Sequence, residues 1–400
     1  MQKKTQFTLT ALTGAVCFAA SAVAHAQSSV TLYGIVDASV VYTNNQKGSS
    51  NVQVQSGKVN GSRWGLKGVE DLGGGTRAVF TLENGFRVND GGLGQAGRLF
   101  GRQAFAGLAQ DGIGTLTFGR QYEPLTDLVS AFAGSGIWSP ATHIGDTDNL
   151  NQTFRINNAV KFRSDPIAGV TLEGMYAFSN QASGDAGQGF GNNRAWGVAT
   201  SYTHGAFSAG VGYLLLNNPD ASTNTAGAVG GASTANGDDY SGQFFYGIDG
   251  GVQRQSIIAG GAGYAFGATT IGFAYSHVLL DYRDGASRTF SNYDLNVRYA
   301  VTPALLLIGD YTFTDGRANS LPQTGGASLK PRWHQFTLAA DYNLSKRTDV
   351  YLSGVYQMAR GDASTSTGTG YAQIASIANI GTAASGRQQL AIMAGIRQRF

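Results

Sequence analysis

Apolar and polar residues alternate with a period of two along much of the chain. Residues 170–179 (VTLEGMYAFS), 292–301 (NYDLNVRYAV) and 350–358 (VYLSGVYQM) each carry an apolar or aromatic side opposite a polar one. Successive side chains of a strand point to opposite faces, so this pattern predicts β-strands with one apolar face. Strands of about 9–11 residues with this alternation are typical of membrane-spanning barrels, because lipid admits strands only in a closed sheet.

The predicted connections alternate between short turns and long loops. The turns fall at residues 71–75, 110–114, 165–169, 205–206, 266–268, 301–303 and 344–347. The loops fall at residues 44–60, 89–97, 123–154, 181–192, 217–251, 284–287, 316–329 and 361–386. Seven turns and eight loops join sixteen strands, an even number as in bacterial outer-membrane barrels. The predicted fold class is therefore all-β, a transmembrane 16-stranded antiparallel β-barrel.

The last residues of the chain alternate in the same way. Residues 390–400 (LAIMAGIRQRF) place apolar side chains opposite Arg397 and Arg399. Pairing of this segment with residues 28–42 is expected to close the barrel without an open edge. Residues 257–280 are nearly uncharged, so a transmembrane helix is the alternative there. Their five glycines and their β-branched and aromatic residues favour two strands joined at 266–268.

Composition and charge narrow the class of protein. The chain has 58 glycines in 400 residues and only 13% charged residues, which favours long β-structure. Residues 1–26 combine a basic start, an apolar run and the small-residue site Ala24-His25-Ala26, and they predict a signal peptide rather than a membrane anchor. The remaining residues, 27–400, form one domain without cysteine, since the chain's one cysteine is Cys17. Their 26 basic and 25 acidic residues give a nearly neutral net charge, which argues against a nucleic-acid-binding protein.

Several motifs together resemble the Gram-negative general diffusion porins, in the branch typical of beta-proteobacteria. They are SSVTLYGIVDASVVYT at 28–43, SRWGLKGVEDLGGGTRAVFTLENGF at 62–86, GRQAFAGL at 101–108, GTLTFGRQYEPLTDL at 114–128 and GIRQRF at 395–400. The resemblance implies a homotrimer of barrels in the outer membrane, each narrowed by its third loop folding inward and needing no cofactor. It also implies that Phe400 at the C-terminus is read by the barrel-assembly machinery.

The third loop, residues 123–154, is the expected site of function, because a loop of that length is usually functional. Strand parity places Arg63, Lys67, Arg155 and Lys161 on the lumen side. The resemblance matches Arg63, Arg102 and Arg155 to an arginine cluster on the barrel wall, and Glu123 and Asp127 to the acidic side of the constriction. Parity does not decide the direction of Arg102, and it conflicts with a lumen position for Arg120.

The predicted function is passive diffusion of small hydrophilic solutes and inorganic ions, limited by size. Opposite charges across a narrow pore make a transverse field that low-dielectric walls focus. Arginines favour anions, as charged rings do in other pores, and the acidic loop residues offset them, so a weak anion preference is expected. A substrate-specific channel is one alternative. A structural or adhesive barrel with a plugged lumen is the other, and its sign would be a folded barrel without conductance.

The sequence offers little for an enzyme. A hydrolase barrel needs a serine and a base within hydrogen-bond reach. His277 follows Ser276 directly, but adjacent strand residues face opposite ways, so the two side chains are not expected to meet. No metal-ligand spacing is present either, although Asp146 and Asp148 leave a surface calcium site open. The expectation is a channel without catalytic residues or a bound metal.

Overall fold

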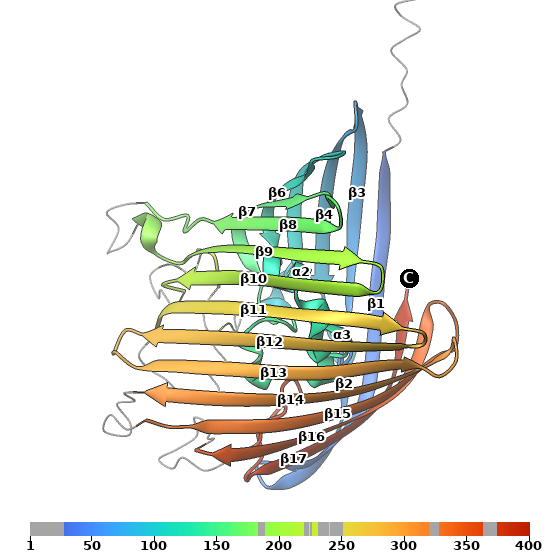
Figure 1. The fold of residues 1–400 in the computed structure, drawn as a ribbon, viewed down its shortest axis with the longest axis vertical. Helices are drawn as coiled ribbons and strands as arrows, with labels where there is room; N and C mark the ends of the chain where they lie inside the picture. The colour runs from blue at the N-terminus through green and yellow to red at the C-terminus, as the bar shows by residue number, and fades with distance from the viewer. Residues whose placement is uncertain are drawn as a thin grey trace, which may run out of the picture.

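The computed structural model describes residues 28–182, 189–219, 224, 226–230, 240, 251–319, 328–362 and 374–400. The predicted signal peptide, residues 1–26, lies outside the described residues. Within these ranges no helix is long and apolar enough to cross a membrane. Strands dominate the described chain and wrap into one sheet (Figure 1).

The sheet is antiparallel and closed on itself. From β3 onward each strand pairs with the next along the chain, β1 pairs with both β2 and β3, and β17 pairs with β1 over the register from Ile35 opposite Arg399 to Thr43 opposite Ala391. The described strands are β1 (Ser29–Gln46), β2 (Ser49–Ser56), β3 (Arg63–Gly73), β4 (Thr76–Gly85), β5 (Gln103–Gln110), β6 (Gly114–Gln121), β7 (Ile156–Ser164), β8 (Val170–Ala177), β9 (Arg194–His204), β10 (Phe207–Asn217), β11 (Val252–Phe266), β12 (Thr269–Tyr282), β13 (Ser287–Ala300), β14 (Leu305–Asn319), β15 (Pro331–Asn343), β16 (Thr348–Gly361) and β17 (Gln388–Arg399).

Strands β2 and β3 share one position in the barrel. β2 pairs with the second half of β1 and β3 pairs with the first half, so the described strands fill sixteen positions. This confirms the predicted closed 16-stranded antiparallel barrel, including the pairing of the last segment with the first. The seven predicted turns also fall between the strands that the sequence placed on either side of them. Residues 257–280 form β11 and β12 rather than a helix.

The first predicted long loop, residues 44–60, is wrong. The chain turns at Lys47 and Gly48, both with positive φ, and residues Ser49–Ser56 form β2. Gly48 N–H donates to the Asn45 side chain at 2.8 Å, which closes the turn. The serine- and asparagine-rich composition suggested a loop, but Val52 and Val54 alternate with polar residues and point outward at 66% and 60% exposure.

Residues 57–62 leave the sheet between β2 and β3, and we call them the wall excursion. Ile35 pairs with Arg63 and Ala38 pairs with Ser56. The excursion therefore has six residues where β1 has only two, Val36 and Asp37. The Asp37 Oδ2 atom accepts hydrogen bonds from the N–H groups of Val59 at 3.0 Å and Asn60 at 2.7 Å. Its Oδ1 atom accepts from the Tyr351 hydroxyl at 2.7 Å. The excursion is therefore a fixed part of the wall.

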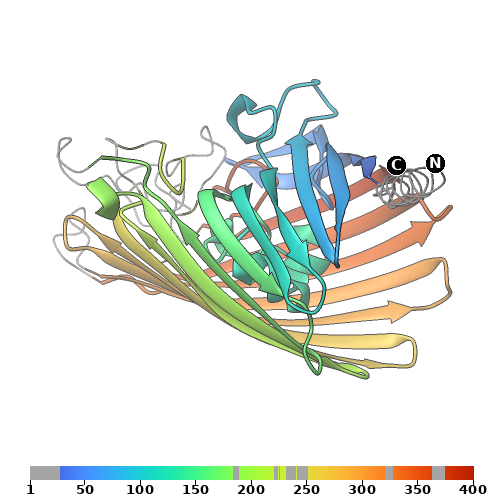
Figure 2. The same ribbon diagram turned by 90° about the horizontal axis from the view of Figure 1, so that it is seen from above.

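The outer face of the barrel is apolar and the inner face is polar. Outward side chains such as Leu32, Leu338 and Leu352 are more than half exposed, whereas inward ones such as Asn292, Asp294 and Thr337 are buried. The third loop crosses the lumen (Figure 2), where its Gly134 and Asp148 bond to Asp294 and Asn292. This arrangement is the reverse of a soluble protein and is the one that a lipid environment requires.

The third loop is built from short helical turns. They are α2 (Pro124–Leu128), η3 (Ser130–Phe132), α3 (Gly134–Ile137), η4 (Ser139–Ala141) and η5 (Ile144–Asp146); η2 (Gln95–Gly97) and η6 (Gly189–Gly191) lie in other loops. Contacts with the inner wall hold the loop inside the barrel. Gly134 N–H donates to Asp294 at 2.7 Å, and Trp138 Nε1–H donates to the Ser353 hydroxyl at 3.0 Å. Gln335 donates to the Thr142 carbonyl at 3.0 Å. The inward fold that the resemblance implied is confirmed.

The contact between Gly34 on β1 and Phe400, which directly follows β17, offers a test of how the barrel closes. Gly34 and Phe400 exchange backbone hydrogen bonds of 3.0 and 3.1 Å, and a Cβ at Gly34 would lie 2.3 Å from the Phe400 ring. We expect Gly34→Val to displace the ring and to cost about 1–3 kcal/mol, as overpacking does. The measurement is the temperature at which the refolded barrel loses its compact mobility on a gel in dodecyl sulfate. Gly174→Val is the control, since a Cβ there meets nothing within 4 Å. Equal effects of the two substitutions would contradict a role of the Gly34–Phe400 contact in closing the barrel.

Candidate functional site

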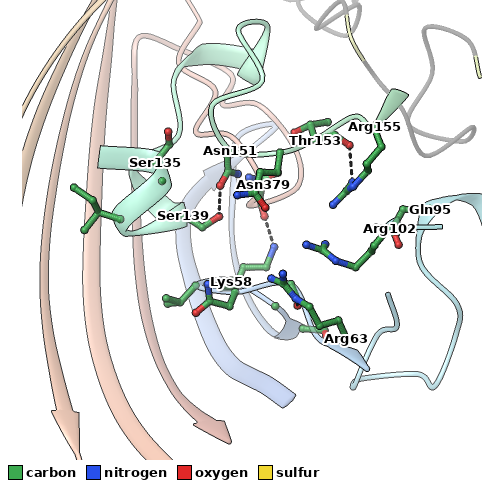
Figure 3. Close-up of a pocket in the computed structure, with 18 residues that line it drawn as sticks. Lys58, Arg63, Gln95, Arg102, Ser135, Ser139, Asn151, Thr153, Arg155 and Asn379 are labelled. Atoms are coloured by element: carbon green, nitrogen blue, oxygen red, sulfur yellow. Dashed lines mark hydrogen bonds between the residues drawn. The ribbon is translucent and has the colours of Figure 1, made fainter. Parts of the chain in front are cut away.

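A pocket of about 340 Å³ lies between the wall excursion and the third loop (Figure 3), and we call it the arginine pocket. The cationic residues among its described lining are Lys58, Arg63, Arg102 and Arg155. Lys58 lies on the excursion, Arg63 begins β3, Arg102 precedes β5 and Arg155 precedes β7. Four separate segments thus bring positive charge to one place. Three of the four are the arginines that the resemblance grouped, and the structure brings them together.

Tyr122, which directly follows β6, holds two of these arginines. The Nη2 atoms of Arg102 and Arg155 both donate to its hydroxyl oxygen, at 2.6 and 2.9 Å. Both guanidinium carbons also lie near the tyrosine ring, at 5.9 and 5.0 Å from its centroid. Burial works against ionisation of Tyr122, but the two positive charges outweigh it and lower the pKa of the hydroxyl. Sequence reasoning missed Tyr122; its only signal was its place between Arg120 and Glu123.

Acids and carbonyls fix the other cationic groups of the arginine pocket. Arg102 Nε donates to Glu83 Oε1 at 2.8 Å, in an ion pair that is almost fully buried. Arg63 Nε donates to the Gly61 carbonyl at 2.9 Å. The Lys58 ammonium donates to the Asn379 carbonyl, and burial lowers the pKa of Lys58 to about 8 although Asp37 raises it. The pocket therefore keeps an excess of positive charge in a defined geometry.

The edge of the third loop that faces these cations is uncharged among the described residues. It consists of Ser135, Gly136, Ile137, Ser139, Asn151, Gln152 and Thr153. Hydroxyl and amide groups there can bond to water or to a polar solute of either sign. The wall side of the pocket is thus positively charged, and the third-loop side is neutral.

The two predicted acidic residues lie elsewhere. Glu123 is fully buried and caps α2: Thr126 N–H donates to its Oε2 at 3.1 Å, and the Thr126 hydroxyl and the Asn149 amide donate to its Oε1 at 2.8 and 3.0 Å. Burial raises the pKa of Glu123 to about 8 despite these hydrogen bonds. Asp127, one turn later, forms an ion pair with Lys161. Glu123 is thus engaged within the third loop and Asp127 with β7, and neither acid lines the arginine pocket.

The remaining predicted residues also lie outside the arginine pocket. Lys161 Nζ donates to the Tyr122 carbonyl at 2.9 Å and lies 3.3 Å from Glu173, beneath α2. Lys67 is exposed, with its ammonium 4.6 Å from the centre of the Tyr33 ring. Arg120 donates to the Gly101 carbonyl at 2.8 Å, next to a register shift in β6, and does not line the pocket. Sequence parity had already set Arg120 apart from the lumen group.

A buried histidine ties the third loop to the wall. His143 Nδ1 lies 2.6 Å from Asp148 Oδ2, and its Nε2 lies 3.0 Å from Asp294 Oδ2 on β13, with all three side chains buried. Burial lowers the pKa of His143, but the two carboxylates outweigh it and hold that pKa well above the usual value. Both ring nitrogens face acceptors, so the imidazole is a cation that bridges loop and wall.

The side chains of Ser276 and His277, which follow each other on β12, point to opposite faces of the sheet. Ser276 points inward and donates to Asp148, whereas His277 contacts the Ser291 hydroxyl at 2.8 Å on the outer face. The two side chains do not meet, as strand parity predicted. Within the described chain no three His, Cys, Asp or Glu side chains are arranged to hold a metal ion.

Comparison with known proteins relates this geometry to one family. The family model described as Gram-negative porin matches residues 8–364. An outer membrane porin protein of Bordetella pertussis is 31% identical, over 87% of this chain and 93% of the relative. Outer membrane porin protein 32 of Delftia acidovorans is 29% identical, over 83% and 85% of the two chains.

Solved structures share the barrel. The anion-selective porin from Comamonas acidovorans superposes with a TM-score of 0.71 at 24% identity, covering 94% of this chain and all of the other. The trimer form of OmpT from Vibrio cholerae superposes with a TM-score of 0.62 at 16% identity, covering 93% and 99%. At these identities the structures show a common fold.

Proposed function

The chain belongs to the Gram-negative porin family, and we propose from this premise that it is a passive outer-membrane channel for small hydrophilic solutes and inorganic ions, with a preference for anions. The solute moves down its own concentration gradient, so no cofactor is needed. Selection depends on the width left beside the third loop and on the charges that line it.

The observation that carries the anion preference is the arginine pocket. Four cationic side chains face an uncharged loop edge across about 340 Å³. An anion gains from each fixed positive charge, and the low-dielectric barrel wall strengthens that gain. Glu83 offsets one of the four charges by its ion pair with Arg102. Since Glu123 and Asp127 do not line the pocket, the reason to expect only a weak preference falls away. The similarity to a porin named as anion-selective agrees with this proposal.

Size selection follows from how the third loop is held. Hydrogen bonds to Asp294, Ser353 and Gln335 fix the loop at several points of the far wall. A fixed loop leaves a passage whose width does not adapt to the solute, so large solutes are excluded. Rigid placement of the loop also keeps its polar edge opposite the arginines.

The assembly that we propose is a homotrimer exported by the signal peptide at residues 1–26 and inserted by the barrel-assembly machinery, which reads Phe400. A trimer form among the solved barrels of this fold supports the oligomeric state. The exposed Phe400 ring, about half accessible beside Gly34, is compatible with recognition by another protein.

The test is the ion current through the refolded protein in a planar bilayer under a potassium chloride gradient. We expect open-channel conductance that closes in three steps, and a zero-current potential shifted toward chloride. A potential shifted toward potassium would leave the porin and remove the anion preference. A folded barrel without current would favour the plugged, structural alternative.

A further inference from the structure

A second pocket, of about 500 Å³, lies at the end of the barrel where the strands are joined by short turns. We call it the turn-end pocket. The turn residues Gly205 and Ala206 border it, and the third loop covers it with Leu128, Ala131 and Phe132. Its described lining shares no residue with that of the arginine pocket. A pocket of this volume is large enough for a small organic molecule.

The two pockets are separated along the pore. Arg155 stands just before β7 and lines the arginine pocket, whereas Arg163 stands near the end of β7 and lines the turn-end pocket. Eight residues of extended chain span about 26 Å. A molecule in the turn-end pocket therefore contacts a different set of side chains from a solute at the arginines.

Positive charge in the turn-end pocket comes from Arg163 and Arg298, and Arg298 has no acidic partner in the described ranges. The Nε atom of Arg298 is buried without a hydrogen bond. Arg163 makes only a long contact, 3.5 Å from Glu173. Asp127 also lines the pocket and Glu173 lies near it, but both acids pair with Lys161. An unpaired guanidinium that faces a pocket is a strong attractor for an anion, and its planar fork suits a carboxylate.

Apolar surface lies beside these charges. Phe132 is pressed against a floor of glycines: a Cβ at Gly261 would lie 2.5 Å from Phe132 Cβ, and one at Gly263 would lie 3.7 Å from its ring. The glycines thus let the ring lie close to the wall, where Leu128 and Ala131 extend the apolar surface. A simple inorganic anion would leave this surface in contact with water, whereas an organic anion would cover it.

We propose that the turn-end pocket binds small carboxylates that carry an apolar body, with Arg298 and Arg163 on the carboxylate and Phe132, Leu128 and Ala131 on the body. The site's lining is distinct from that of the arginine pocket. Its occupancy does not depend on whether the protein conducts.

The test is calorimetric titration of benzoate into the full chain, refolded in detergent. We expect one site per chain and a dissociation constant at least about tenfold higher in Arg298→Gln, the loss of a charge-assisted pair. Arg163→Gln is expected to weaken binding less, because Glu173 already engages that arginine. Arg317→Gln is the matched control: Arg317 is largely exposed, and its nearest acid is 4.0 Å away. Acetate and phosphate, titrated separately, are expected to bind more weakly than benzoate.

Three results would overturn the proposal. The first is folded protein that binds no benzoate. The second is acetate or phosphate binding as tightly as benzoate, which would show a site for simple anions. The third is equal weakening by Arg298→Gln and Arg317→Gln, which would show a general charge effect. If Arg298→Gln does not refold, Arg298→Lys keeps the charge, removes the fork and serves the same comparison.

Discussion

Replacement of Arg63, Arg102 and Arg155 by serine is expected to abolish the preference for chloride over potassium. A unit charge about 7 Å from an ion in water contributes about 0.6 kcal/mol. Screening at 0.1 M salt roughly halves that figure. Three charges therefore change chloride partitioning by about fivefold and potassium partitioning by a similar factor in the other direction. The measurement is the zero-current potential across a bilayer under a salt gradient.

Loss of Arg102 adds to this effect, because Glu83 then remains in the wall without its 2.8 Å partner. A buried acid that loses its cation also destabilises the barrel, by about 3–5 kcal/mol. Arg63→Ser alone avoids this difficulty, since Arg63 bonds only to the Gly61 carbonyl in the described structure. That single variant is expected to lower chloride partitioning by about one and a half-fold.

Lys67→Ser is the control of equal charge. Lys67 points into the lumen from the same strand as Arg63 but does not line the arginine pocket. Its replacement is expected to leave the zero-current potential nearly unchanged. If Lys67→Ser matched Arg63→Ser, selectivity would come from the total charge of the lumen. If the triple variant kept the chloride preference, the arginine pocket would not be the selective element.

Replacement of His143 by alanine is expected to release the third loop. The substitution leaves Asp148 and Asp294 buried without their shared cation, and breaking such a contact costs about 3–5 kcal/mol. Amide hydrogen exchange in peptides from residues 123–154, measured by mass spectrometry, is expected to accelerate about a hundredfold or more.

The same contact gives the loop a pH dependence with a definite sign. Because the folded pKa of His143 is raised, its stabilisation is complete below the unfolded pKa of about 6.5 and declines as the pH rises toward the folded value. Burial raises the pKa of Glu123 to about 8, and burial together with Asp148 raises that of Asp146 to about 7. Charging these acids also weakens the loop as the pH rises. Protection corrected for intrinsic exchange is therefore expected to fall as the pH rises, from about pH 4 because of the two acids and more steeply above about pH 6.5 because of His143.

His277→Ala is the control for the histidine. His277 also has a hydrogen-bond partner, Ser291 at 2.8 Å, but it faces outward and does not contact the third loop. Its replacement is expected to leave exchange in residues 123–154 unchanged. Protection that rose with pH in the unmodified chain, or that survived in His143→Ala, would contradict the bridging role.

The barrel could be predicted from the sequence because the residue pattern of each strand reflects the surroundings of its two faces. Lipid on one side and water or the loop on the other impose the period of two, so pairs such as Ser276 and His277 could be oriented without a structure. The pairing of residues 390–400 with β1 followed from the need to leave no open edge. The strand β2 was missed because eight polar-rich residues, with only Val52 and Val54 apolar, read as a loop.

The interior of the barrel could be predicted only in part. The resemblance grouped Arg63, Arg102 and Arg155, which the structure places in one pocket, whereas strand parity alone left the direction of Arg102 undecided. Glu123 and Asp127 were placed by analogy, but their directions depend on the turn of α2, which periodicity does not reveal. The bridge from His143 to Asp294 joins residues 151 positions apart, and a sequence pattern carries no signal for such a contact.

In a regular barrel, a change in the length of a strand alters both the register of the sheet and the side chains that line the pore. The wall excursion allows the lining to change without the register. In a regular sheet, an inserted residue shifts the pairing of a whole strand and turns its side chains to the other face. Residues 57–62 are flanked by two registers that are each anchored independently on β1, one at Ile35 and one at Ala38. A residue gained or lost within the excursion would leave both registers in place and change only the segment that carries Lys58. The lining of the pore can therefore vary during evolution at this point while the architecture around it is conserved.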